Sequence, residues 1–257
     1  MGIFNLFNKN SQVQPIESER VKEPYLGDLN KTQLIFKLVS VPLEKRDDSW
    51  KDAFLENIVL ASFRCGDPQV ITGPDGFPYF QLLMPQPNQS FQCYVIERMK
   101  DDFLLKAGYG VVINPDVGQP DWVLSYGDIV SLHLTGAFYT AESTVFSSVR
   151  EDETIREDEK VLIGQPSELI LPDMTRSVLR EFLSANGVKS PKVLLMSRSK
   201  ALGEKASQDL VFNLTPADFG SEETFRNVMG HLGWFLPRHY SYVGMRENQF
   251  EDGFIAL

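Results

Sequence analysis

The chain of 257 residues has only two cysteines and three histidines. Cys65 and Cys93 are too far apart in sequence for a CxxC metal or redox pair, and we expect reduced thiols because no secretory signal is present. The spacing of His133, His231 and His239 is not that of a zinc site. We therefore expect no metal and no cofactor.

Long apolar runs and an excess of basic residues are also lacking. No run approaches the ~20 apolar residues of a membrane helix. The formal net charge is -10, from 25 Lys and Arg against 35 Asp and Glu. Such a balance repels phosphate backbones and anionic lipid surfaces, so we expect neither a nucleic-acid nor a membrane partner. The hydrophobic content of 42% is typical of a globular protein, here expected in the cytoplasm.

The signatures of common catalytic sites are absent: GxxxxGK[ST], HExxH and GxSxG do not occur. "GYGVVI" contains a GxG, but it lies between a predicted helix and a predicted strand and lacks the third glycine of a dinucleotide site. Cys93 lies in an apolar run, where burial disfavours the reactive thiolate. A pairing of either cysteine with a histidine stays open as an alternative, but we predict no catalytic residues.

Charge and turn residues divide the chain into four parts. Residues 1–27 are predicted to be a tail, and residues 28–149 a first α+β domain. "REDETIREDEK" has one apolar residue, so residues 150–160 are interpreted as an acidic linker. Residues 161–257 form the predicted second domain.

In the first domain, apolar residues at helical spacing predict a helix from Asp28 to Pro42, and Asp48 is a candidate N-cap for a second helix. A strand is expected from Ile58 and a turn at 74–76. A helical stripe closed by Gly108, the strand "GVVIN", a short strand around Trp122 and a helix over 128–135 complete the pattern.

In the second domain, the pattern predicts the order β-α-β-β-α-β, which is that of the ferredoxin-like split fold. Its first helix starts at Pro172 and Asp173 and ends at Gly187, and its second is capped by Ser221. The fold class is therefore α+β with two domains.

The N-terminus "MGIFNLFNKN" carries Leu6 where a myristoylation signal has Ser or Thr. Ile3, Phe4, Leu6 and Phe7 have the spacing of one apolar helical turn. Two readings stay open: a tail without contacts, or a short anchor that contacts a partner or the other domain.

The stretch "GHLGWFLPRHYSYVGM" has the composition of a contact surface. We expect Gly233 to end the last helix, and Val243 and Met245 to face the helices, so that Tyr240 and Tyr242 face the open side of the sheet. Three interpretations remain: a contact with the other domain, a half-buried sheet surface, or a surface for an external partner. The candidate contact residues are Trp234, Arg238, His239, Tyr240 and Tyr242.

Asn114 ends the buried strand "GVVIN" immediately before Pro115. Ligand sites of α/β proteins often lie at such strand ends, so Asn114 is a candidate ligand residue. A turn-forming asparagine explains the same position equally well.

Taken together, several stretches resemble the SseB family of bacterial enhanced serine sensitivity proteins. The stretches are "DGFPYF", "AGYGVVINP", "WVLSYGDI", "IGQPSELILPDMTRSVLREFL", "VKSPKVLLM" and "WFLPRHYSYV", in that order over roughly residues 29–245. The resemblance implies two α+β domains in a cytoplasmic bacterial protein and brings no catalytic residues with it.

These features favour a non-enzymatic interaction or regulatory protein with a protein partner. One alternative is a binder of, or enzyme acting on, a small amino-acid-related metabolite, which rests on the serine phenotype in the family name. The other is an immunity-type protein that neutralises a toxin, which is compatible with the acidic charge.

Overall fold

A computed structural model of the protein describes residues 25–115, 118–140, 145–146, 160–199, 207–250 and 253–257. The chain divides into two compact units, Met1–Ile129 and Val130–Leu257. Both units combine helices with strands, which confirms the predicted α+β class. The predicted boundary near residue 150 lies outside the described residues, whereas the division by contacts falls inside the helix α5 (Tyr126–Thr135).

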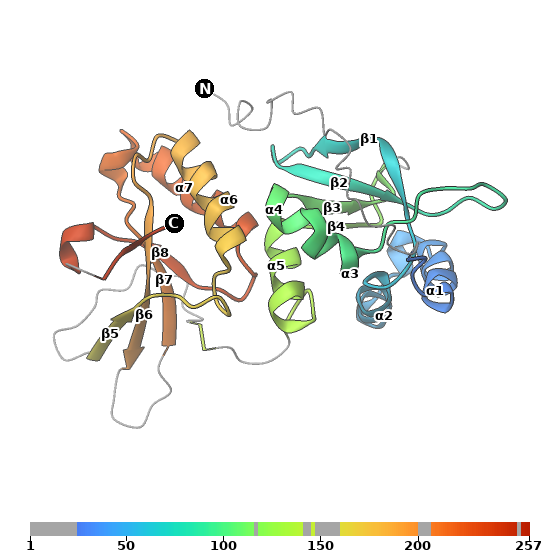
Figure 1. The fold of residues 1–257 in the computed structure, drawn as a ribbon, viewed down its shortest axis with the longest axis horizontal. Helices are drawn as coiled ribbons and strands as arrows, with labels where there is room; N and C mark the ends of the chain where they lie inside the picture. The colour runs from blue at the N-terminus through green and yellow to red at the C-terminus, as the bar shows by residue number, and fades with distance from the viewer. Residues whose placement is uncertain (1–24, 116–117, 141–144, 147–159, 200–206, 251–252) are drawn as a thin grey trace, which may run out of the picture. The chain divides into compact units, whose positions relative to one another are not determined.

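The first unit begins with two helices and continues into a four-stranded sheet (Figure 1). In chain order its elements are α1 (Leu29–Val39), η2 (Leu43–Lys45), α2 (Asp48–Ile58), β1 (Arg64–Thr72), β2 (Pro78–Leu83), α3 (Ile96–Met99), the π-helical turn η3 (Lys100–Leu104), α4 (Leu105–Ala107), β3 (Gly110–Ile113), β4 (Trp122–Leu124) and the start of α5.

Short acidic side chains define where the first two helices of this unit begin. The carboxylate of Asp28 accepts hydrogen bonds from the N–H groups of Asn30 and Lys31, at 2.8 and 3.1 Å. Asp47, rather than the predicted Asp48, caps α2 by accepting from the N–H of Trp50 at 2.8 Å. These bonds satisfy N–H groups that have no partner inside the helix.

The predicted strand from Ile58 starts later than expected. Ile58 is the last residue of α2, and it is buried with Trp50 and Phe54 at a spacing of four residues. The apolar run after Phe54 therefore first continues the buried face of the helix, and the strand begins only at Arg64.

The first sheet has the order β1-β2-β3-β4. β1 and β2 are antiparallel, β2 and β3 are parallel, and β3 and β4 are antiparallel. Every residue of β2 and β3 is buried, so these strands form the centre of the unit. The register of β1 against β2 shifts between Cys65 and Val70, which is a β-bulge in an edge strand of the sheet.

The second unit carries its two long helices on one face of a sheet (Figure 1). In chain order its elements after α5 are β5 (Lys160–Gly164), α6 (Asp173–Ala185), β6 (Lys192–Ser199), β7 (Ser207–Phe212), η5 (Pro216–Asp218), α7 (Glu222–Phe235), β8 (Tyr242–Gly244), η6 (Glu247–Gln249) and β9 (Ile255–Ala256).

The element order β-α-β-β-α-β is as predicted, but the ferredoxin-like split is not found. The strands follow the order β5-β6-β7-β8, with β9 pairing β6. β5 lies directly beside β6 and antiparallel to it, and β7 lies directly beside β8 and parallel to it. A split requires another strand between the two strands that a helix connects, and no strand is inserted in either pair.

The two faces of β8 are used in the opposite way to the prediction. Val243 and Met245 pack against the buried cluster of Leu194, Met196 and Val211, and Phe250 and Phe254 of the C-terminal segment pack there too. Tyr242 instead faces α7, because a Cβ placed on Gly233 would lie 2.8 Å from its hydroxyl. The sheet therefore has no open side at this point, since the C-terminal segment covers the face away from the helices.

A buried ion pair lies on that covered face. The guanidinium of Arg198 donates from Nε and Nη2 to one carboxylate oxygen of Asp209, at 3.2 and 3.0 Å. The hydroxyl of Ser241 donates to the other oxygen. The side chains of Arg198 and Asp209 are 9% and 1% exposed, so the pair is largely removed from water.

Helix α7 is also longer than predicted. It continues through Gly233 to Phe235, and Leu236 leaves the helix in an extended conformation before Pro237. A residue that precedes proline is driven out of the helical region, so Pro237 explains this end better than Gly233 does. Trp234 and Phe235 consequently belong to the helix.

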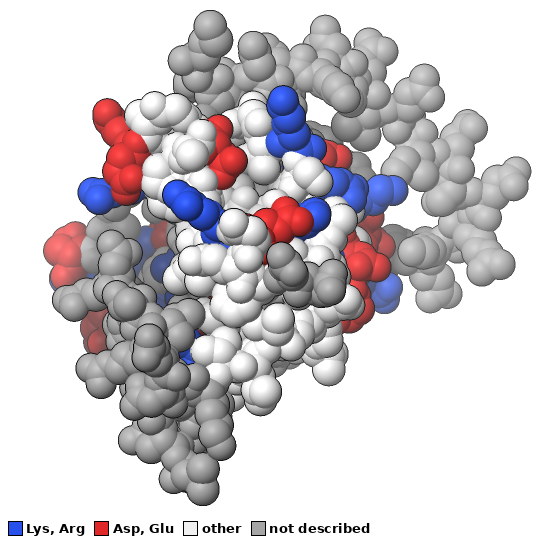
Figure 2. All heavy atoms as spheres, turned by 90° about the vertical axis from the view of Figure 1, so that its left-hand side faces the viewer, with Lys and Arg blue, Asp and Glu red and all other residues white. Residues whose placement is uncertain are grey.

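Figure 2 shows one face of the molecule, on which Lys and Arg side chains lie among Asp and Glu side chains around an uncharged area. The described charges on this face are thus mixed in sign.

Candidate functional site

The first unit contains an open groove with a volume of about 880 Å³. It lies between the start of the described chain, the segment before α3, and one face of the α3–η3 helix. The lining residues are Tyr25, Leu26, Phe91, Gln92, Cys93, Tyr94, Val95, Arg98, Met99, Asp102 and Phe103. We refer to this feature as the aromatic groove, because four of these side chains carry an aromatic ring.

Two backbone attachments hold the walls of the groove. Tyr94 exchanges two backbone hydrogen bonds with Phe63, at 2.9 and 2.8 Å, which fixes the segment before α3. The hydroxyl of Ser62 donates to the carbonyl oxygen of Leu26, and the N–H of Asp28 donates to the carbonyl of Leu60 at 2.8 Å. These bonds attach the start of the described chain to the residues directly before Phe63. Both walls of the groove are therefore held by the same loop.

Two of the aromatic rings that line the groove pack against a buried ring of the sheet. The ring of Phe80, which is buried in β2, lies 5.3 Å from that of Tyr94 and 5.1 Å from that of Phe103. At the rim, the guanidinium carbon of Arg98 lies 4.7 Å from the ring centre of Tyr25. This cation–π contact places a positive charge beside an apolar surface.

Three apolar side chains at the rim are exposed to solvent. Tyr25 is 43% exposed, Leu26 is 61% exposed and Phe91 is 40% exposed. Covering exposed apolar area releases roughly 25 cal/mol per Å². The rim therefore favours contact with another apolar surface.

The helix beside the groove contains a π-helical turn, a feature that occurs frequently at functional sites. Lys100 in this turn is buried, and its ammonium group donates to Glu97 and Asp101 at 3.0 and 2.7 Å. Burial alone would lower the pKa of Lys100, but the hydrogen bonds to Asp101 and Glu97 outweigh it and raise the pKa. The charged ammonium group of Lys100 therefore stabilises this turn through its bonds to Glu97 and Asp101.

The bulge of β1 brings a second polar group to Tyr94. The amide of Gln69 lies 3.2 Å from the hydroxyl of Tyr94 and 3.6 Å from the sulfur of Cys65. Burial, and next the thiol of Cys65, raise the pKa of Tyr94 to about 12. The phenol is neutral at physiological pH, so it offers a hydrogen bond rather than a nucleophile to anything in the groove.

Both cysteines are free, as expected. They lie in the first unit, whereas His133, His231 and His239 lie in residues 130–257. Within its own unit, neither thiol has a described histidine beside it that could act as a base.

The candidate ligand residue Asn114 lies at the end of β3, as predicted, with φ at 50°. Its amide donates to Asp121 at 2.6 Å, and its carbonyl oxygen accepts from the N–H of Met84 at 3.0 Å. Asp121 also binds Arg46 at 2.6 Å. These bonds tie three loops together and explain Asn114 without a ligand. Asn114 does not line the aromatic groove, and a ligand role stays a prediction.

The five predicted contact residues belong to one region of the second unit but not to one open surface. The hydroxyl of Tyr240 donates to the carbonyl of Ile170 at 2.8 Å, and its ring stacks on Phe146 at 4.0 Å. Burial raises the pKa of Tyr240 to about 12. Tyr242 is partly buried against α7, and burial raises its pKa as well. Both tyrosines are therefore packing residues of their own unit.

The other three residues also have contacts within this unit. The ring of His239 lies 4.8 Å from that of Tyr240, and burial lowers the pKa of His239. The ring of Trp234 meets that of Phe235 edge-on at 5.0 Å. Arg238 is the exposed member, and its guanidinium carbon lies 4.5 Å from the ring centre of Tyr139. A role of this group in partner binding stays a prediction.

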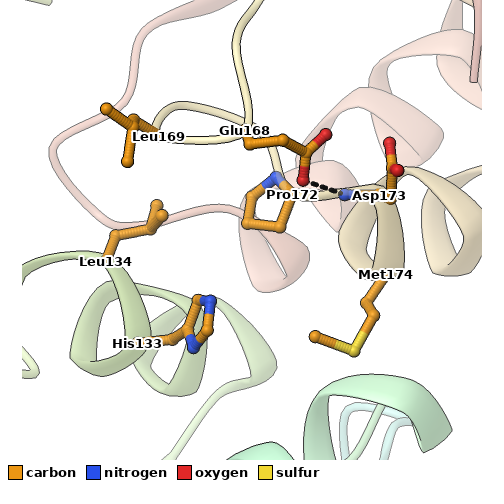
Figure 3. A pocket seen from close by; sticks show the side chains of 7 residues that line it. All are labelled: His133, Leu134, Glu168, Leu169, Pro172, Asp173 and Met174. Carbon is orange, nitrogen blue, oxygen red and sulfur yellow. Dashed lines mark hydrogen bonds between the residues drawn. The ribbon is translucent and has the colours of Figure 1, made fainter.

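A second, smaller hollow of about 270 Å³ lies in residues 130–257 (Figure 3). His133 is exposed there. Glu168 accepts from the N–H of Asp173 at 3.0 Å, and both carboxylates approach Arg176 at 3.8 and 3.9 Å. The acidic groups thus have local structural partners, and this hollow offers little for a ligand.

Among the residues that the structure describes, no three His, Cys, Asp or Glu side chains form a group that could hold a metal ion. In the same part of the chain, every helix is too short or too polar to cross a membrane. A scan of protein families, a search of curated proteins and a search of solved structures each find no match to this chain.

Sequence reasoning did not identify the aromatic groove. Its residues come from three separate stretches, and none of these stretches contains a motif. One signal for the groove was present in the sequence. Aromatic and apolar residues gather at 25–26 and 91–95, next to prolines and turn residues that interrupt the regular pattern. Apolar residues outside regular elements can indicate an interaction surface.

Proposed function

We propose that this protein is a non-enzymatic interaction protein that binds an apolar, aromatic-rich segment of a partner protein in the aromatic groove. The observation that carries the proposal is the set of exposed apolar side chains at the rim, with Leu26 at 61% and Phe91 at 40% exposure, beside the rings of Tyr94 and Phe103, which pack against Phe80. Exposed apolar side chains that gather around one groove are a feature of interaction sites in proteins.

Secondary support comes from the irregular backbone around the groove. A π-helical turn forms one wall and a β-bulge lies beside Tyr94. Both irregularities are often found near functional sites, because they direct side chains that regular structure would not place there. The resemblance to SseB proteins agrees with a non-enzymatic role in the bacterial cytoplasm, and the net charge of -10 argues against a nucleic-acid or membrane partner.

The test compares groove variants in affinity purification from the native host. Phe91→Asp places a charge on the rim at an exposed position, so we expect the fold to remain intact and partner recovery to fall at least about tenfold. Leu162→Asp is the matched control, because Leu162 is 74% exposed but lies on β5 of the other unit. Equal recovery with both variants would remove the groove from the proposal.

A second candidate function is the binding of a small carboxylate-containing metabolite such as an amino acid. The volume of about 880 Å³ lies within the range of small-molecule sites, and Arg98 at the rim could pair with a carboxylate. A thermal-shift titration with serine and related amino acids tests this. A shift that disappears in Arg98→Gln supports it, and no shift at millimolar concentration rejects it.

A further inference from the structure

The aromatic groove opens where the described part of the chain begins. Tyr25 and Leu26 line it, and residues 1–24 directly precede them. The same N-terminal stretch carries the apolar residues Ile3, Phe4, Leu6 and Phe7. We propose that the aromatic groove binds the chain's own segment Ile3–Phe7, which then competes with the partner. This inference rests on the proposed function, since it requires that the groove accept apolar segments.

The segment can reach the groove. Residues 8–24 connect it to Tyr25 and would span at most roughly 60 Å when fully extended. A flexible chain of this length has a root-mean-square span of about 20–25 Å. A segment tethered in this way has an effective concentration on the order of 1 mM. An intrinsic dissociation constant of about 0.1 mM would therefore fill about nine grooves in ten.

The chemistry of the segment matches that of the groove. Ile3, Phe4, Leu6 and Phe7 stand at positions i, i+1, i+3 and i+4, the spacing of one apolar face of a helical turn. The groove offers the rings of Tyr25, Phe91, Tyr94 and Phe103, and aromatic rings favour edge and stacked contacts with phenylalanine.

The tether favours the chain's own segment over the same segment of a second copy. A second copy at micromolar concentration competes against an effective concentration roughly a thousandfold higher. The groove is thereby closed to weak partners and open only to partners that bind it more tightly than the tethered segment does.

The chain contains a reporter for this contact. Cys93 lines the groove, whereas Cys65 does not, and both thiols are partly exposed. Alkylation of each cysteine in the full-length chain can be followed by mass spectrometry, with Cys65 as the internal control. In Phe4→Ser/Phe7→Ser we expect the alkylation rate of Cys93 to rise about fivefold or more and that of Cys65 to stay unchanged.

Asn5→Ser/Asn8→Ser is the matched control, because it alters the same segment at polar positions. We expect wild-type rates for both cysteines in it. A synthetic peptide of residues 1–12, added at millimolar concentration, should restore protection of Cys93 in Phe4→Ser/Phe7→Ser. It should fail to do so when Phe91→Asp is also present.

Equal Cys93 rates in the wild type and in Phe4→Ser/Phe7→Ser would overturn the inference. So would protection that grows with protein concentration, because the segment would then come from a second copy. If the peptide fails but partner recovery still depends on Phe91, only this inference is wrong. If recovery is also independent of Phe91, the proposed function is wrong as well.

Discussion

The two units pair their strands according to the same plan. In each, an antiparallel hairpin is followed by a helical connection and a third strand parallel to the second, as β1-β2-β3 in the first unit and β6-β7-β8 in the second. The fourth strand is added at opposite ends: β4 beside the third strand of the plan in one unit, and β5 beside its first strand in the other. The two sheets therefore share the arrangement of three strands and differ in the edge at which the fourth strand is added.

The units also place their buried charges differently. In the first, Arg46, Asp121 and Asn114 connect loops at the ends of strands. In the second, Arg198 and Asp209 lie within a sheet face under the C-terminal segment. The shared arrangement of three strands therefore does not require a particular network of polar side chains. The elements around each sheet determine where polar groups are buried and where a groove stays open.

The sharpest test of this difference is Asp209→Ala. It leaves the guanidinium of Arg198 buried without its carboxylate, so we expect the second unit to lose about 3–5 kcal/mol of unfolding free energy. Urea unfolding, followed by hydrogen exchange of peptides from each unit, measures the loss. Arg226→Ala, which removes an exposed pair with Glu222, is the control and should change stability by about 0.5 kcal/mol or less.

The corresponding change in the first unit is Asp121→Ala. The side chains of Arg46 and Asp121 are 9% and 15% exposed, so their pair is better solvated than the one in the second unit. We expect a loss of about 2–3 kcal/mol, confined to peptides of residues 25–129. A larger loss than that of Asp209→Ala would reverse the order that the comparison predicts.

A smaller effect is expected where α7 meets β8. The Cβ of Gly233→Ala would lie 2.8 Å from the hydroxyl of Tyr242, so we expect a destabilisation of about 1–2 kcal/mol. Tyr242→Phe removes that hydroxyl, and the double variant should recover most of the loss. Thermal unfolding of the two single variants and the double variant measures the coupling, and additive effects would contradict this packing.

The smallest effect concerns pH. Burial lowers the pKa of His239, so the unfolded chain takes up a proton near pH 6.5 that the folded chain resists. This contribution to stability is present above pH 6.5 and is lost as the pH falls from there through the lowered pKa. His239→Gln should flatten the slope of unfolding free energy against pH in this window, which urea titrations at several pH values can measure.

Local sequence signals predicted most elements correctly. The first helix starts directly after Asp28, Ser221 caps its helix as predicted, and Gly108 closes its helical segment with φ at 71°. Gly187 follows the end of α6 with φ at 95°. Each of these predictions depends only on neighbouring residues, which is why a single sequence was sufficient.

Long-range packing accounts for the wrong predictions about the second sheet and for the missed groove. The outward side of β8 was assigned by alternation alone, and alternation cannot show that Phe250 and Phe254 cover the face away from the helices. The strand order of the second sheet depends on which strand β5 pairs with, and "KVLIG" carries no information on its partner. The groove depends on Phe80 lying beneath Tyr94 and Phe103, which are distant from it in sequence.

The parallel pairs β2–β3 and β7–β8 also bear on how the protein folds. A hairpin joins neighbouring strands and forms within about 1–10 μs, whereas a parallel pair must wait for its connecting helix to order and for a longer loop to close. We therefore expect hairpins β1–β2 and β6–β7 to form first in their units. The third strand then joins each hairpin only after the intervening helix has folded.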